Sequence, residues 1–380
     1  MQVFDTLPPA SPRQGFLRTV SAWLDAALVE FGPEGTMHYA QTTLHGENDS
    51  LFTTGMEERH VIFGDTSGLE AAIMEIDSNR HPNLIFVTSS PVSEIIGTDL
   101  ADICCDLQDQ IRAHLCPWDR VPLEGYASDG RRSAFRIAAA QLSSLTAHQA
   151  DRNGFFVLGL DRSDWNGRSD LNELRRMMQQ YFGLTCRNDL NGRYRLNDLP
   201  SARLILVADA AAQPLADVCK DRWGIPSCAG LTYGLQSTKA LVDHVASLLQ
   251  QTPSPYWRED FAAADDALLA FRQSVRTWPK RTFRLCLDSH RANLLAAFLT
   301  EELGQQVHTL REDDFLTKPS PDEILIGSGL LCSLYPENDS LCMDYPTITQ
   351  MVFSSHFPFA GLYGTENLLT AMYALLARQK

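Results

Sequence analysis

The residues best suited to redox or metal chemistry in this chain of 380 residues are its nine cysteines. They are scattered, and no two of them form a C-x-x-C pair. Cys104 and Cys105 are adjacent, so on a helix their side chains point to different faces and cannot readily bind one metal ion. We expect the isolated cysteines to be buried as small apolar side chains in a reducing cytoplasm; they include Cys116, Cys219, Cys228, Cys286, Cys332 and Cys342.

Other catalytic patterns are missing from the sequence. There is no G-x-x-x-x-G-K-[ST] loop, and residues 64–68 lack the lysine and the spacing of a phosphate-binding loop. No Ser-His-Asp or H-E-x-x-H pattern stands out. The sequence thus assigns no catalytic residue, and any ATP used in a reaction would have to be bound by a separate protein.

Polar residues follow a fully apolar segment at residues 84–87, which is typical of a strand buried on both faces of a parallel sheet. Ser90, Pro91 and Glu94 come directly after it. The carboxyl end of a parallel strand is where α/β proteins place their ligands. These residues are therefore candidates for a binding site.

The elements that must position such a site alternate between strands and helices along the chain. The pattern predicts strands at 61–63, 84–87, 155–160, 204–207, 281–288 and 323–327, and helices at 16–29, 69–76, 98–115, 132–148, 170–182, 237–249 and 293–303. This order predicts three α/β domains with parallel sheets, at 1–150, 151–255 and 256–380, the third with a C-terminal helical return. We expect them to surround a cleft lined by residues after Val87, Val207 and Ile326.

Composition and charge exclude some partners. The formal net charge of −15 argues against nucleic acid or an anionic membrane as the main partner. No apolar run reaches the length of a membrane span, and the amino terminus does not look like a signal peptide. A cytoplasmic protein is expected.

Residues 52–99 resemble the nitrogenase component 1 family, which includes the molybdenum–iron protein subunits, their scaffold proteins and the dark-operative protochlorophyllide reductase subunits. The family has a T-x-M-x-E-x-x-x-V-F-G-G pattern, followed after a helix and a strand by T-T-C-x-x-E-I-I-G-D-D. The matching positions here are Thr54, Met56, Glu58, 61–64, 94–97 and Asp99. Residues 357–369 resemble the closing P-x-x-G-Y-x-G-x-x-N-L-L of the family. The resemblance implies three Rossmann-like domains.

The resemblance also marks where cluster ligands would lie, and there the chain departs from the family. Pro91 takes the place of a cluster-binding cysteine, and Ser50 takes the place of another after His45-Gly46; the earliest such position falls near residues 7–10, which also lack cysteine. Asp209 replaces the cofactor cysteine of the middle domain, although it could simply cap the helix that follows. Near the cofactor histidine position the chain has Met351, with His356 five residues later. Iron–sulfur clusters need thiolates, so we expect no metal ligand set and no cluster bound by this chain alone.

Two functions are compatible with the resemblance. In the first, the chain is a subunit of a nitrogenase-like, ATP-dependent two-component reductase with little or no activity alone. A homologous component 1-type subunit would hold most cluster ligands, and an iron-protein-type ATPase would deliver electrons. The substrate would be a tetrapyrrole or another small unsaturated or sulfur-bearing molecule. In the second, the chain is a non-catalytic scaffold or carrier for a metallocluster or tetrapyrrole cofactor precursor. Under either function, the candidate cleft residues are Ser50, Met56, Ser90, Pro91, Glu94, Asp209 and His356.

Overall fold

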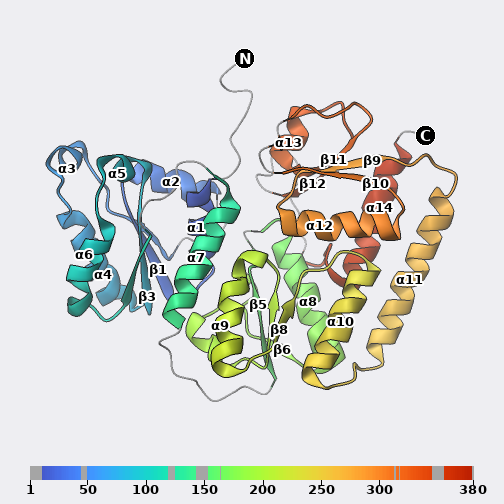
Figure 1. The fold of residues 1–380 in the computed structure, drawn as a ribbon, viewed down its shortest axis with the longest axis horizontal. Coiled ribbons are helices and arrows are strands. Elements are labelled where there is room, and N and C mark those ends of the chain that lie inside the picture. Colours follow the sequence, from blue (N-terminus) through green and yellow to red (C-terminus); the bar gives the residue numbers. More distant parts are fainter. Residues whose placement is uncertain are drawn as a thin grey trace.

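Three parallel sheets form the frame of the protein (Figure 1). The computed structural model describes residues 11–43, 49–118, 125–142, 153–162, 164–311, 314–315, 317–344 and 355–378. Each sheet has four strands, in the orders β2-β1-β3-β4, β6-β5-β7-β8 and β10-β9-β11-β12. All neighbouring strands pair in parallel. The predicted α/β class with three parallel, helix-flanked sheets is confirmed.

The first sheet and its helices belong to the N-terminal part of the chain. Its strands are β1 (Ala26–Phe31), β2 (Leu51–Thr53), β3 (Leu84–Ser89) and β4 (His114–Trp118). Its helices are α1 (Pro12–Ser21), α2 (Glu34–Thr43), α3 (Glu58–Phe63), α4 (Ser67–Arg80), α5 (Pro91–Ile96), α6 (Leu100–Leu107) and α7 (Ala127–Leu142), with the 3-10 turn η1 (Gln108–Gln110).

The second sheet comprises β5 (Gly154–Leu158), β6 (Thr185–Cys186), β7 (Leu204–Val207) and β8 (Ser227–Ala229). It is flanked by α8 (Gly167–Phe182), α9 (Gln213–Trp223) and α10 (Leu235–Leu249), with the 3-10 turns η2 (Leu196–Ser201) and η3 (Ala210–Ala212). The third sheet comprises β9 (Thr282–Leu285), β10 (Gln306–Thr309), β11 (Ile324–Ser328) and β12 (Ser340–Asp344). Its helices are α11 (Tyr256–Val275), α12 (Ser289–Ala297), the π-helical turn η4 (Phe298–Glu302), α13 (Gly329–Leu334) and α14 (Gly361–Ala377).

Three segments of the first unit differ from the sequence-based expectation. The helix expected at 16–29 ends at Ser21, and its second half is β1, the strand between β2 and β3. The strand expected at 61–63 is the end of α3. The helix expected at 98–115 ends at Leu107, and β4 begins at His114.

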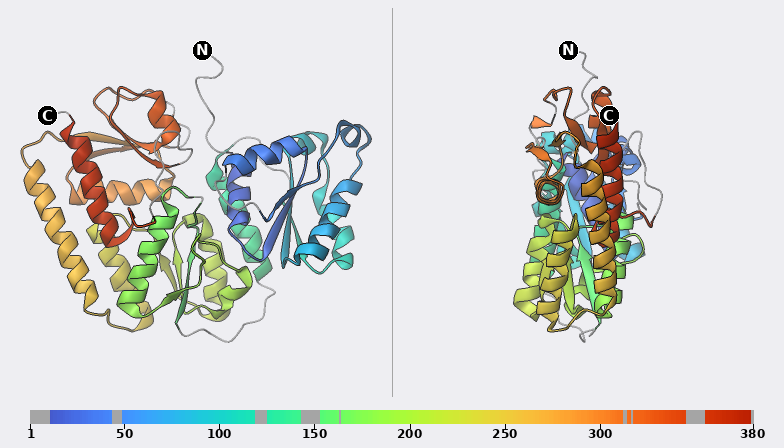
Figure 2. Two further views of the ribbon diagram at one scale, coloured as in Figure 1. Left: turned by 180° about the vertical axis from the view of Figure 1, so that it is seen from behind. Right: turned by 90° about the vertical axis from the view of Figure 1, so that its right-hand side faces the viewer.

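Two glycines bring α1 and α7 into close contact beside the first sheet (Figure 2). A Cβ on Gly130 would fall on the carbonyl oxygen of Pro12, and a Cβ on Gly15 would fall on that of Ala127. Any larger residue would therefore force the helices apart. The close crossing sets the positions of Arg18 on α1 and Arg131 on α7.

The units share continuous apolar packing. One cluster of buried side chains joins Trp23 of the first unit to Tyr194 of the second, and the Trp23 indole nitrogen donates to the Tyr194 hydroxyl at 3.0 Å. Another cluster runs from Phe155 of the second sheet to Phe283 of the third and includes Leu368 of α14. The loops at these junctions are consequently held in fixed positions.

Candidate functional site

Each sheet has the same strand order, in which its first strand lies between its second and third. The chain therefore passes to one side of the first strand to form the second strand, and then crosses to its other side to form the third. This change of direction opens a crevice at the carboxyl end, between the first and third strands of the sheet. In the second sheet this switch point lies between Gly159, after β5, and Asp209, after β7. A Cβ on Gly159 would lie 2.6 Å from that of Asp209, so the two loops touch.

Arg131 of α7 occupies the switch point of the second sheet. Its Nη2 donates to the carbonyl oxygen of Gly159 at 3.0 Å, and its Nε lies 2.6 Å from an Asp209 carboxylate oxygen, off the line of a regular hydrogen bond. Its Nη1 donates to Asp164 at 3.1 Å. A side chain of the first unit thus sits where a doubly wound sheet commonly binds its ligand.

The positive charge of Arg131 is balanced by carboxylates in the loops of the second and third sheets. Burial alone would lower the pKa of Arg131, but the carboxylates of Asp209, Asp164, Asp161 and Asp288 raise it above its usual value. Burial alone would raise the pKa of Asp164, but the guanidinium groups of Arg18 and Arg131 hold it below its usual value. Arg18 also pairs directly with Asp164. Arg131 and Asp164 are therefore both ionised at neutral pH.

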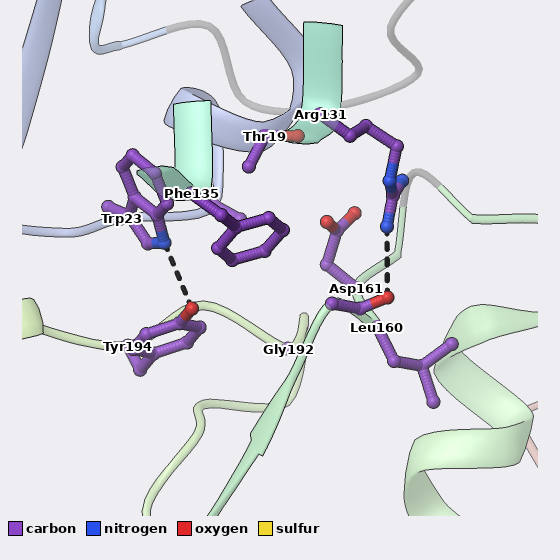
Figure 3. Close-up of a pocket in the computed structure, with 10 residues that line it drawn as sticks. Thr19, Trp23, Arg131, Phe135, Leu160, Asp161, Gly192 and Tyr194 are labelled. Atoms are coloured by element: carbon purple, nitrogen blue, oxygen red, sulfur yellow. Dashed lines mark hydrogen bonds between the residues drawn. The ribbon is translucent and has the colours of Figure 1, made fainter. Parts of the chain in front are cut away.

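A small cavity lies beside this ion network (Figure 3). The carboxylate of Asp161 points into it, and Arg131 reaches it from α7. Its other walls are aromatic and apolar, including Trp23, Phe135 and Tyr194. Gly192 in its wall has a φ of +85° and leaves no room for a side chain, since a Cβ there would lie 2.6 Å from the Cα of Asp161.

The third sheet contributes a second arginine to the same region. Asp288, which follows β9, caps α12 by accepting from the backbone N–H groups of His290 and Arg291 at 3.1 Å each. Arg291 donates to the Tyr233 hydroxyl at 3.2 Å and lies 3.8 Å from Asp344 at the end of β12. The Arg291 charge also acts on Asp164. Charged residues in the loops of the second and third sheets therefore interact electrostatically. The first unit contributes Arg18 from α1 and Arg131 from α7.

The switch point of the first sheet is closed by its own side chains. Gly32, after β1, packs against Ser90, whose side chain would collide with any Cβ there. Ser90 and Ser93 bond each other's backbone N–H at the start of α5. Glu94 accepts from the Ser89 hydroxyl at 2.5 Å. Among the described residues, those after Val87 therefore bond within the first unit, and the cleft expected around all three sheets stays a prediction.

The candidate residues named from the sequence fall into separate places. Met56 is buried, and its N–H donates to the Gly32 carbonyl at 2.9 Å, so it lies at the same sheet edge as Ser90 and the exposed Pro91. Ser50 precedes β2 and bonds Leu28 through its carbonyl, which places it towards the opposite end of the strands. Asp209 both pairs with Arg131 and caps the turn η3 by accepting from the Ala211 N–H at 2.8 Å.

His356 lies on an exposed part of the segment that precedes α14. The segment is held against α8, where Ser169 accepts from the Phe357 N–H at 2.9 Å and Asn172 donates to the Ser355 carbonyl at 2.9 Å. Met351 lies outside the described residues. His356 therefore sits with α8, away from the switch point of the first sheet.

The side chains present do not fit an iron–sulfur cluster. Pro91 has no donor atom, and the Ser90 and Ser93 hydroxyls are already used in capping α5. Burial raises the pKa of Cys116, Cys219, Cys228, Cys286 and Cys342 to about 12, so these thiols stay protonated and are poor metal ligands. Within the described residues, no three His, Cys, Asp or Glu side chains are grouped as a metal site. Cys104 is buried and Cys105 is exposed, as their adjacency on one helix predicts.

Three parallel four-stranded sheets of one strand order define a three-unit α/β protein. Residues 13–311 match the family described as nitrogenase component 1 type oxidoreductase, and the chain belongs to that family. The resemblance drawn from the sequence is confirmed. Among the helices that the structure describes, none has the length and hydropathy needed to cross a bilayer.

The chain is similar to proteins of nitrogenase cofactor assembly. The nitrogenase iron-molybdenum cofactor biosynthesis protein NifE of Clostridium pasteurianum is 27% identical over 202 residues, covering 52% of this chain and 43% of that protein. NifE of Bradyrhizobium diazoefficiens is 24% identical over 255 residues, covering 65% of this chain and 44% of that protein. The matched regions therefore span less than half the length of these relatives. The solved structure of nitrogenase Cp1 at pH 6.5 superposes with a TM-score of 0.77 at 15% identity, over 98% of this chain and 94% of that one, which establishes the fold.

Proposed function

We propose that this chain is a subunit of a component 1-type assembly whose cluster ligands come mainly from a homologous partner subunit. The observation that carries the proposal is the edge of the first sheet at Pro91. By resemblance a cluster thiolate belongs there, but Pro91 offers no donor and is exposed. This chain would complete and close the site, and the ligands would approach from across the interface.

In the favoured form of this proposal the assembly is an ATP-dependent reductase of the cytoplasm. A separate iron-protein-type ATPase would supply electrons, since the sequence has no phosphate-binding loop of its own. The nine cysteines are all free thiols, which suits a reducing compartment. The substrate would be a small molecule, such as a tetrapyrrole or another unsaturated or sulfur-bearing compound.

A scaffold for a metallocluster precursor is the second candidate. The observation in its favour is the similarity to NifE proteins of two organisms, which are cofactor biosynthesis proteins. The lack of any catalytic pattern in the sequence suits a carrier equally well. Both functions need the same partner subunit, but they differ in what the complex does with electrons.

Anaerobic co-expression with candidate component 1-type subunits and an iron protein tests the two functions. A reductase subunit should yield a complex that consumes ATP and passes electrons to a bound acceptor only when the iron protein is present. A scaffold should instead release its cluster to an acceptor protein without catalytic turnover. Failure of the chain to copurify with any component 1-type subunit would contradict both functions.

A further inference from the structure

The crevice at the carboxyl end of the second sheet is filled by a side chain of the first unit. Arg131 enters it from α7 and is only 8% exposed. Its guanidinium nitrogens face the Asp209 carboxylate, the Gly159 carbonyl and the Asp164 carboxylate. The two walls of the crevice touch, because a Cβ on Gly159 would lie 2.6 Å from that of Asp209. The charge of Arg131 therefore lies between the loops that a ligand would have to separate.

Little free space remains beside Arg131 among the residues that the structure describes. The neighbouring cavity, into which Asp161 points, has a volume of about 10 Å³, which is room for one water molecule (Figure 3). Because protein interiors are close-packed, a larger group would enter only if the Arg131 side chain moved out. A cluster of several iron and sulfur atoms therefore does not fit among these residues in the arrangement that they have.

The chemistry of the available donors also opposes a metal centre. Asp209 stands where the resemblance places a cofactor cysteine, and it offers a carboxylate where iron–sulfur chemistry needs a thiolate. Its Oδ2 lies 2.6 Å from the Arg131 Nε, so a metal cation would have to displace a guanidinium from this carboxylate. Asp164 of the second unit also pairs with that guanidinium, and the charge of Asp288 from the third unit acts on it. The residues present therefore do not fit a metallocofactor.

We infer that Arg131 fills this crevice in the isolated chain and in the complex alike, so that no metallocofactor or cluster precursor binds there. The guanidinium takes the place of a ligand and joins the first unit to the loops of the second. The inference deepens the proposed function and rests on it in one respect, namely that a partner subunit exists. Any cluster in the complex then lies at the interface with that partner, and a scaffold would carry its precursor there and not inside the second unit.

Asp209→Cys in the isolated chain tests whether Arg131 fills the crevice. The side chain of Asp209 is 27% exposed, so iodoacetamide can reach the introduced thiol, and peptide mass spectrometry distinguishes it from the native cysteines. Because a neighbouring guanidinium stabilises a thiolate, the pKa of this thiol should lie at least about one unit below its usual value of about 8.5.

The same thiol in the double variant Arg131→Met, Asp209→Cys should have its usual pKa or a higher one. Asp217→Cys, at an exposed position on α9, is the matched control, and its pKa should not change when Arg131→Met is added. Circular dichroism checks that every variant folds. Equal pKa values of the thiol at position 209 with and without Arg131→Met would overturn the inference.

Iron bound per mole of assembled complex extends the test to the partnered state. Asp209→Asn should hold as much iron as the wild type and as Asp217→Asn, because the cluster ligands lie elsewhere. A loss of iron confined to Asp209→Asn would show a metal centre in the crevice and overturn the inference, while the partner itself stays established. If no component 1-type subunit binds, the proposed function fails, but the thiol measurement on the isolated chain still decides whether Arg131 fills the crevice.

Discussion

The positively charged guanidinium of Arg131 is buried in the middle of the molecule, and the carboxylates around it stabilise its charge. The sequence gives no local sign of this role, since Gly159 and Asp164 lie 28 and 33 residues away and Arg18 lies 146 residues from Asp164. Asp209 was identified from the sequence, but its ion pair was not. Long-range pairs of this kind depend on how helices pack on sheets, which residue patterns do not encode.

Replacing Arg131 by methionine should destabilise the protein by about 3 kcal/mol. The change leaves Asp164 and Asp209 without their shared cation, although Asp164 keeps Arg18 and Asp209 stays partly exposed. Urea unfolding of Arg131→Met measures the loss. The control is Arg132→Met, because Arg132 is half-exposed and pairs with Asp129 on the surface at 3.3 Å; it should change stability by less than about 0.5 kcal/mol. Equal effects of the two variants would refute a central role for Arg131.

Asp170 should make stability depend on pH. Burial raises its pKa to about 6, although the backbone N–H groups of Ala360 and Phe359 act in the opposite direction. A carboxyl with a raised folded-state pKa contributes stability that is fully present below its unfolded pKa of 3.8 and is lost as the pH rises through about 6. The free energy of unfolding of the wild type minus that of Asp170→Asn should therefore fall by up to about 3 kcal/mol between pH 4 and pH 7.

Ser169→Ala is the control for this pH dependence. Ser169 accepts from the Phe357 N–H of the same segment, but it does not titrate. Its loss should cost about 1 kcal/mol at every pH. Parallel stability curves for the wild type and Asp170→Asn across this range would show that the carboxyl does not titrate as expected.

Among the elements, long strongly patterned segments were predictable and short ones were not. The strand at 204–207 and the helix at 170–182 are flanked by clear stop signals and were identified correctly. The apolar residues of β1 continue the helical spacing of α1 past Ser21, so the sequence pattern predicts a helix where the structure has a strand. Val61, Ile62 and Phe63 of α3 favour a strand by residue type. However, β propensity largely reflects burial on a sheet, and Ile62 and Phe63 are exposed.

The crossing of α1 and α7 should not tolerate a single added methyl group. Gly130→Ala would place its Cβ on the Pro12 carbonyl, so the helices must separate, at a cost of about 1–3 kcal/mol. Gly68→Ala is the matched control, because nothing lies within 4 Å of its Cβ position and it sits in α4. This control should stabilise the protein by about 0.5 kcal/mol. Thermal unfolding that moves both variants in the same direction would contradict the close crossing.

At the scale of the whole molecule, the three-unit frame was predictable and the arrangement of its centre was not. Repeated strand–helix order and the family motifs predicted three parallel sheets, which the structure confirms. Helices α1 and α7 lie between the first sheet and the other two units (Figure 1), and a cleft shared by all three strand edges stays a prediction. Pro91, at the edge of the first sheet, is exposed.

Iron and sulfide content, measured on the isolated chain and on its complex with the component 1-type partner, tests the central claim most directly. Both samples are purified without oxygen and compared per mole of chain. The account predicts essentially no bound iron on the isolated chain, because its described side chains provide no ligand set, and about four irons per cluster in the complex. About four irons per mole of the isolated chain would show that this chain holds a cluster by itself and would contradict the account.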